Sequence, residues 1–229
     1  MFTAMTIAML AAIAVWWVLI QRLKDKPWLT QGVIPTSQEG LTSSAPKVGL
    51  WAFLAVVTSL FGLFASAYMM RMHDGHGGLA GWQRLDEPSI LWVNTLVLVL
   101  ASGALQIARN RIDKDQLEHG RAHFAAAGLL TVLFLVGQVL AWRLANPSGT
   151  LGASSPAYSL FVLVTAAHGL HLIGGLFVLG RTARHLFQGV EKAGVVARSR
   201  LRLSVQLCTT YWHWLLLIWL GLFALLLST

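Results

Sequence analysis

Three histidines stand within long apolar stretches of this sequence, where imidazole is the side chain best suited to chemistry. His168 and His171 are three residues apart, so they share one face of a helix, and His213 lies in the next apolar stretch. Imidazole is the commonest metal ligand and can hold haem between facing helices. The alternative is that each ring bonds a neighbouring group at a helix contact. Gly169, Gly174 and Gly175 favour this packing role, because small residues let helices approach closely.

A second pair of histidines supplies further candidate ligands for haem. His119 and His123 are four residues apart and could pair with His168 or His171 as a bis-histidine site, with His213 as a further candidate. The chain would then be a small b-type dihaem cytochrome. The charged residues around His119 and His123 favour a solvated helix end instead. The predicted spans contain no Asp or Glu, which argues against a free-standing transporter.

The composition predicts the solvent in which this chain folds. Of 229 residues, 56% are hydrophobic and 11% are charged, against roughly a quarter charged in soluble domains. The apolar residues exceed what one soluble core could bury, so the natural environment is a bilayer. The net charge of +8 does not indicate nucleic-acid binding, because Lys and Arg fall in short segments between apolar runs. The single cysteine, Cys208, provides neither a disulfide framework nor a thiolate cluster.

The elements that must position the histidines are membrane-spanning helices. About 20 apolar residues are needed to cross about 30 Å of hydrocarbon. We therefore predict an all-α polytopic bundle of about six transmembrane helices, near 2–21, 48–70, 88–108, 122–142, 156–180 and 203–227. The fifth could extend inwards beyond Gly180 as an amphipathic continuation. The predicted domains are an amino-terminal anchor helix over 1–22, a cytoplasmic tether over 23–47 and a five-helix bundle over 48–229.

The distribution of basic residues predicts the orientation. Most of the 17 Lys and Arg fall in the first, third and fifth connections. By the positive-inside rule these connections face the cytoplasm, so both termini are expected on the outer side. The first apolar run lacks a basic leading region, which favours an uncleaved anchor over a signal peptide. Trp142 and Trp212 lie near predicted span ends, where indoles serve as interface anchors.

The last two spans contain two recognisable motifs. The last span has the run Tyr-Trp-His-Trp from residue 211, and the span before it has the run Thr-Ala-Ala-His-Gly-Leu-His from residue 165. The first run resembles the signature, and the second the Thr-Gly-x-His-Gly-x-His pattern, of subunit III of cytochrome c and quinol oxidases, in the haem-copper oxidase family. The resemblance covers roughly 48–227, and its residues are predicted to pack helices or to contact neighbouring subunits or lipid: Asn94, Ser102, Gln138, Thr165, His168, Gly169, His171, Gly174, Tyr211, Trp212, His213 and Trp219.

The resemblance implies a five-helix core with no catalytic residue, haem or metal of its own. Such a subunit packs beside catalytic subunit I, and near subunit II, of a terminal oxidase in the bacterial inner membrane. It supports the catalytic subunit and holds phospholipid in its clefts. Haem and copper are expected in the partner subunits, and either cytochrome c or quinol could supply the electrons.

This chain departs from the family at three carboxylates. The corresponding positions appear as Val57, Ala141 and Leu216. The roles of those carboxylates, whether proton supply or ordering of polar groups, therefore do not transfer. The departures indicate a divergent bacterial member and leave open an accessory protein of a nitric oxide reductase.

Overall fold

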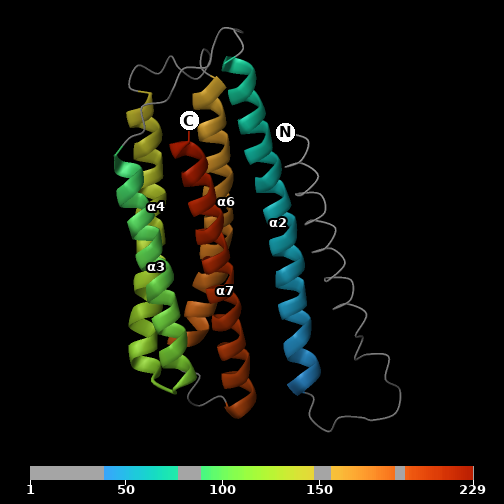
Figure 1. Ribbon diagram of the computed structural model, residues 1–229. Coiled ribbons are helices and arrows are strands. Elements are labelled where there is room, and N and C mark those ends of the chain that lie inside the picture. Colours follow the sequence, from blue (N-terminus) through green and yellow to red (C-terminus); the bar gives the residue numbers. More distant parts are fainter. Residues whose placement is uncertain (1–38, 77–88, 147–155, 189–193, 229) are drawn as a thin grey trace, which may run out of the picture. The chain divides into compact units, whose positions relative to one another are not determined.

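The computed structural model describes residues 39–76, 89–146, 156–188 and 194–228. Every helix or strand in these ranges is an α-helix, five in all: α2 (Glu39–His76), α3 (Ile90–Asp113), α4 (Leu117–Ala145), α6 (Pro156–Phe187) and α7 (Gly194–Leu227) (Figure 1). Each contains a segment long and apolar enough to cross a membrane. The all-α polytopic prediction is confirmed for these residues. The predicted first span, 2–21, lies outside them.

The chain divides into two compact units, Met1–Thr42 and Ser43–Thr229, and the second contains almost all the described residues. The predicted anchor and most of the predicted tether lie outside the described residues. The end of the tether belongs to α2 instead, which begins at Glu39 and includes Pro46. Hydropathy did not indicate this start, because the first turns of α2 are polar.

Helices α6 and α7 also continue past the predicted spans at their basic ends. Helix α6 runs to Phe187 because Leu186 is buried and its carbonyl accepts a 3.0 Å hydrogen bond from Arg121 Nε. Helix α7 begins at Gly194, and its Arg202 pairs at 2.7 Å with Asp115 in the turn between α3 and α4. Arginine can keep its charge in water beside an apolar stem, so these turns stay helical outside the hydrocarbon.

Four of the helices form a closed bundle in which each packs against two others. Neighbouring pairs are α3 with α4, α4 with α6, α6 with α7, and α7 with α3. Helices α3 and α4 pack most extensively, through a buried stripe that includes small residues such as Ala101, Ala108, Ala127 and Ala141. Small side chains allow two backbones to approach in a solvent where burial of apolar groups gives no driving force.

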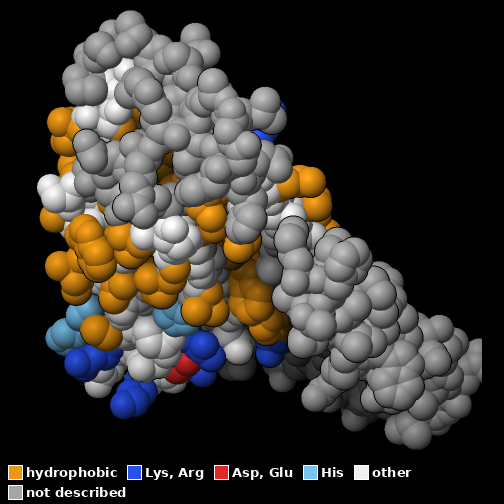
Figure 2. All heavy atoms as spheres, turned by 45° about the horizontal axis from the view of Figure 1, so that its top comes forward, with side chains coloured by type: hydrophobic (Ala, Val, Ile, Leu, Met, Phe, Trp, Pro, Cys, Tyr) orange, Lys and Arg blue, Asp and Glu red, His pale blue; other side chains and the backbone are white. Residues whose placement is uncertain are grey.

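Helix α2 reaches this bundle through large side chains. Its Val57 and Phe61 form a buried cluster with Val164 of α6 and Leu222 of α7. The outward surfaces are apolar, as Leu63, Leu129 and Phe177 illustrate. Figure 2 shows an apolar belt with most of the visible Lys and Arg at one end of the described residues. The surface is therefore that of a protein solvated by lipid.

Candidate functional site

The resemblance residues of α6 and α7 meet in the bundle interior. The Tyr211 hydroxyl donates a 2.8 Å hydrogen bond to the backbone carbonyl of His171. The Trp212 side chain is 1% exposed and its indole donates to Thr131 of α4 at 3.1 Å. Trp212 is therefore an interior residue, and the prediction that it anchors the membrane interface is wrong. Its partner Thr131 was not among the predicted site residues.

Indole-to-threonine hydrogen bonds recur across the fold. The other pairs are Trp142 with Thr165 at 2.9 Å, Trp214 with Thr58 at 2.8 Å and Trp219 with Thr95 at 3.0 Å. They join α4 to α6, and α7 to α2 and α3. Each of the four threonine hydroxyls also donates to the carbonyl four residues earlier in its own helix, at 2.7–2.9 Å. We call each such arrangement a Trp–Thr pair. Each threonine hydroxyl accepts a hydrogen bond from an indole of another helix and donates to a carbonyl of its own helix, so its one donor is used.

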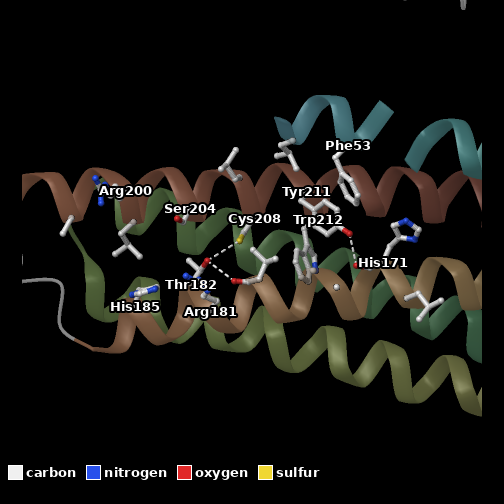
Figure 3. Close-up of a pocket in the computed structure, with 18 residues that line it drawn as sticks. Phe53, His171, Arg181, Thr182, His185, Arg200, Ser204, Cys208, Tyr211 and Trp212 are labelled. Carbon is white, nitrogen blue, oxygen red and sulfur yellow. Dashed lines mark hydrogen bonds between the residues drawn. The ribbon is translucent and has the colours of Figure 1, made fainter. Parts of the chain in front are cut away.

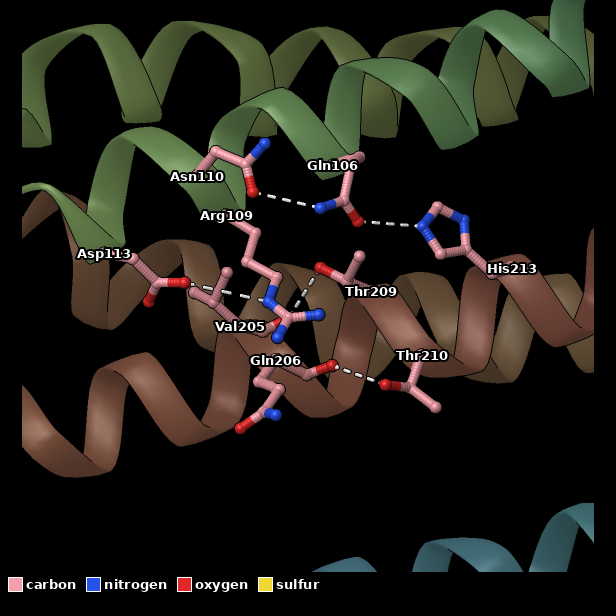
Figure 4. Close-up of polar contacts among 9 residues, drawn as sticks. All are labelled: Gln106, Arg109, Asn110, Asp113, Val205, Gln206, Thr209, Thr210 and His213. Atoms are coloured by element: carbon pink, nitrogen blue, oxygen red, sulfur yellow. Dashed lines mark hydrogen bonds and ion pairs between the residues drawn. The ribbon is translucent and has the colours of Figure 1, made fainter.

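His213 forms a polar chain between α7 and α3 (Figure 4). Its Nε2 donates to Gln106 Oε1 at 3.0 Å, and its Nδ1 contacts the Ser102 hydroxyl. The Gln106 amide nitrogen then donates to Asn110 at 3.0 Å. Both ring nitrogens of His213 are therefore engaged by protein groups. Ser102 was predicted as a site residue, whereas Gln106 was not, although its position one turn from Ser102 places it on the same face.

His168 and His171 occupy different environments although they share a helix. His168 is fully buried, with the rings of Phe134 and Trp219 at centroid distances of 6.0 and 5.2 Å. Neither nitrogen of His168 has a hydrogen-bond partner within the described residues. His171 is half-buried, and its Nδ1 donates to the Ala167 carbonyl at 2.7 Å.

Two further predicted residues, Asn94 and Gln138, face the bundle interior. Their side chains are 4% and 2% exposed. The Nδ2 atom of Asn94 and both amide atoms of Gln138 have no hydrogen-bond partner among the described residues. These two amides and His168 are thus the buried polar groups that the described protein atoms leave unsatisfied.

The predicted glycines differ in how closely neighbours approach them. A Cβ atom on Gly169 would lie 3.6 Å from the nearest Leu135 atom, which is ordinary contact, and one on Gly174 would meet nothing within 4 Å. A Cβ on Gly175 would lie 2.6 Å from Tyr211 and 2.9 Å from Trp212. The tightest crossing in this run is therefore at Gly175, which was predicted as a packing glycine but not as one of the site residues.

A cleft of about 1100 Å³ lies between α2, α6 and α7 (Figure 3). One end carries basic and polar side chains: Arg181, Thr182, His185, Arg200 and Ser204. The rest of the lining is mostly apolar and aromatic, and includes Phe53, Leu170, Val178, Leu207 and Tyr211. The cleft is therefore amphiphilic, with its cationic end on the same side as the basic ends of the helices.

The histidines of α4 lie far from the histidines in the bundle interior. Arg121 contacts the carbonyl of Leu186, so His119 and His123 lie at that end of α6, about 27 Å along the helix from His168. That separation is too large for His119 or His123 to share a haem with His168. Within the described residues, no three His, Cys, Asp or Glu lie together in a way that could hold a metal ion.

Several known proteins are similar to this sequence over much of its length, although no family model matches it. It is 30% identical over 185 residues to the cytochrome c oxidase subunit 3 of Thermostichus vulcanus, covering 78% of this chain and 85% of that relative. It is 29% identical over 136 residues to the probable cytochrome c oxidase subunit 3 of Mycobacterium tuberculosis, covering 58% of this chain but only 62% of that relative. It is 24% identical over 175 residues to the cytochrome bo(3) ubiquinol oxidase subunit 3 of Pseudomonas aeruginosa, covering 76% and 80%.

Proposed function

Because this chain belongs to the cytochrome c oxidase subunit 3 family, we propose that it is a non-catalytic membrane subunit of a respiratory haem-copper oxidase in bacteria. The observation that carries the proposal is the 30% identity to a named oxidase subunit over 85% of its length. Its partners would be the catalytic subunit I and subunit II, with haem and copper held by those partners. The role of this chain would be to support subunit I and to bind lipid.

The contacts of the family-like residues support a packing role. The rings of Trp212, His213 and Trp219 form hydrogen bonds with side chains of neighbouring helices. Val57 and Ala141, which stand at two of the missing carboxylates, are buried in apolar surroundings. An ionised carboxylate at either position would be costly unless a polar partner compensated it. The chain thus supports its complex by shape and packing.

The orientation is part of the same proposal. Most basic residues of α3, α4, α6 and α7 lie at one end of the described helices, whereas Arg143 lies in the last turn of α4 at the other end. By the positive-inside rule the end with most of the basic residues faces the cytoplasm, and both termini face the outer side of the inner membrane.

Co-purification tests the proposal directly. A tagged chain extracted in mild detergent from its native membrane should bring down a larger haem-copper subunit, identified by mass spectrometry. The optical haem spectrum should stay with that partner when the complex is dissociated. A nitric oxide reductase as the partner would instead establish the accessory alternative. Haem retained by the isolated chain would establish the b-type cytochrome, and a chain that arrives alone without haem would contradict all three functions.

We assign lipid binding to the cleft between α2, α6 and α7. Its apolar lining suits acyl chains, and Arg181 and Arg200 at its basic end suit an anionic phosphate headgroup. Each cation near an anionic lipid surface contributes about 1 kcal/mol. The occupant that matches both ends is a phospholipid with its headgroup on the cytoplasmic side.

Removing the two cations should release that lipid. We expect the double substitution Arg181→Gln and Arg200→Gln to lower phospholipid affinity roughly thirtyfold, from about 2 kcal/mol of lost attraction. The measurement is the amount of phospholipid retained by the purified complex, determined by mass spectrometry. Arg184→Gln is the matched control, because Arg184 is an exposed arginine on α6 that does not line the cleft. Equal retention in the double variant and the control would contradict this assignment.

A further inference from the structure

Five buried polar atoms in the bundle interior have no protein partner within the described residues. They are Nδ2 of Asn94, Nε2 and Oε1 of Gln138, and Nδ1 and Nε2 of His168. All three side chains are at least nine-tenths buried. Buried polar groups in proteins are almost always hydrogen-bonded, because an unmade bond leaves the full cost of removing the group from water. Three such groups on three different helices therefore require an explanation.

The three side chains lie at one level of the bundle. A Cβ on Gly137 would come within 3.0 Å of the Asn94 amide nitrogen, so Asn94 of α3 lies against the residue preceding Gln138 of α4. The His168 ring of α6 contacts Phe134 edge-on at a centroid distance of 6.0 Å. Phe134 is one helical turn from Gln138 and therefore lies on the same side of α4.

Helix α7 contacts the same region of the bundle through Trp219. The Trp219 ring lies 5.2 Å from His168 and 4.9 Å from Phe134, measured between centroids. Its indole nitrogen donates to Thr95, the residue after Asn94. Because Trp219 uses its only donor on Thr95, it has none to offer the unsatisfied atoms. The other rings against His168, those of Phe134 and Phe61, have no polar group.

The chemistry of the five atoms defines what would satisfy them. The two amide nitrogens donate, the amide oxygen accepts, and a neutral imidazole supplies one donor and one acceptor. The set therefore needs partners for three donating atoms and two accepting atoms. A pair of waters bonded to each other retains three acceptor and three donor sites, which suffices. A partner subunit cannot supply these groups, because the side chains are almost fully enclosed by this chain.

We propose that a pair of ordered waters is bound between Asn94, Gln138 and His168, bridging α3, α4 and α6 inside the membrane-spanning bundle. Buried waters of this kind make two to four hydrogen bonds and act as part of the protein structure. The site would explain why an imidazole and two amides are placed among aromatic rings without bonding one another. It is independent of the proposed oxidase role, since it concerns the interior of this chain alone.

The direct test is density for water in the assembled complex, at a resolution that shows ordered waters. Peaks should appear at about 2.6–3.2 Å from the His168 nitrogens and the Gln138 amide. A direct bond between Gln138 and His168, or an interior without such peaks, would overturn the proposal. This measurement uses the unaltered protein, so it does not depend on how any variant folds.

A double-mutant cycle gives an independent test. Gln138→Met and His168→Phe each remove one set of bonds, and the midpoint temperature for unfolding of the detergent-solubilised complex is measured. Groups that share bound water are energetically coupled. The double substitution should therefore lower the midpoint temperature by clearly less than the sum of the decreases caused by the two single substitutions. The control cycle joins Gln138→Met to Thr182→Val, because Thr182 lies about 21 Å from His168 along α6. Additive losses in both cycles would refute a shared site.

Discussion

Replacing Gly175 by alanine should destabilise the bundle, whereas the same change at the adjacent Gly174 should not. The added Cβ would lie 2.6 Å from Tyr211 Cε1 and 2.9 Å from two ring carbons of Trp212. Neither ring can move freely, since Tyr211 is bonded to the His171 carbonyl and Trp212 to Thr131. Overpacking of this kind costs about 1–3 kcal/mol.

The larger substitution Gly175→Leu should prevent α6 and α7 from packing at this crossing, so the chain should be absent from purified complex. Gly174→Ala is the matched control, because its Cβ meets nothing within 4 Å. Alanine there should be neutral or stabilise the helix by about 0.5–1 kcal/mol. The measurements are the unfolding temperature and the amount of chain retained in the complex. Equal stability of the two alanine variants would show that α6 and α7 do not cross at Gly175.

Truncating Trp219 to alanine should have the other large effect. The side chain is fully buried, stacks edge-on against Phe134 at 4.9 Å and bonds Thr95 at 3.0 Å. Lipid is as apolar as the interior, so the loss comes from a cavity and from missing dispersion contacts. Large core truncations of this type cost about 3–5 kcal/mol. We expect the unfolding temperature to fall strongly and the chain to be lost from the complex on detergent extraction.

Trp92→Ala provides the control for this prediction. Trp92 is 59% exposed on the outer surface of α3, so its removal leaves no enclosed cavity. The destabilisation by Trp219→Phe should lie between those of Trp219→Ala and Trp92→Ala, because phenylalanine keeps most ring contacts and loses the hydrogen bond to Thr95. If Trp219→Ala were no more destabilising than Trp92→Ala, the interior position of Trp219 would be wrong.

Hydropathy and the family-like motifs predicted most of this fold. The predicted span 122–142 falls inside α4, and the predicted span 88–108 begins two residues before α3 and ends inside it. Both were recognised because a membrane-spanning helix must be apolar along the length that crosses the hydrocarbon. The continuation of α6 beyond Gly180 was anticipated as an amphipathic extension. The start of α7 was placed too late, because an arginine-rich helical turn outside the hydrocarbon has the hydropathy of a loop. The start of α2 was missed because its first turns are polar.

The contacts within the candidate site could be predicted only in part. The sequence indicated that glycines near His168 mark a helix contact, but not which glycine is closest to its neighbour. Successive residues differ by about 100° around a helix, so the choice between Gly174 and Gly175 depends on how α6 is rotated against α7. The partner of Trp212 depends likewise on the register between α7 and α4, which no local pattern encodes.

The Trp–Thr pairs constrain the order in which this sequence can change during evolution. Losing the indole first, as in Trp219→Phe, leaves Thr95 with its bond to the Leu91 carbonyl intact. Losing the hydroxyl first, as in Thr95→Val, leaves an indole N–H buried without an acceptor, at a cost of about 1–3 kcal/mol. Lineages that replace a Trp–Thr pair by an apolar contact should therefore substitute the tryptophan first. Homologues that keep only the threonine should then outnumber those that keep only the tryptophan.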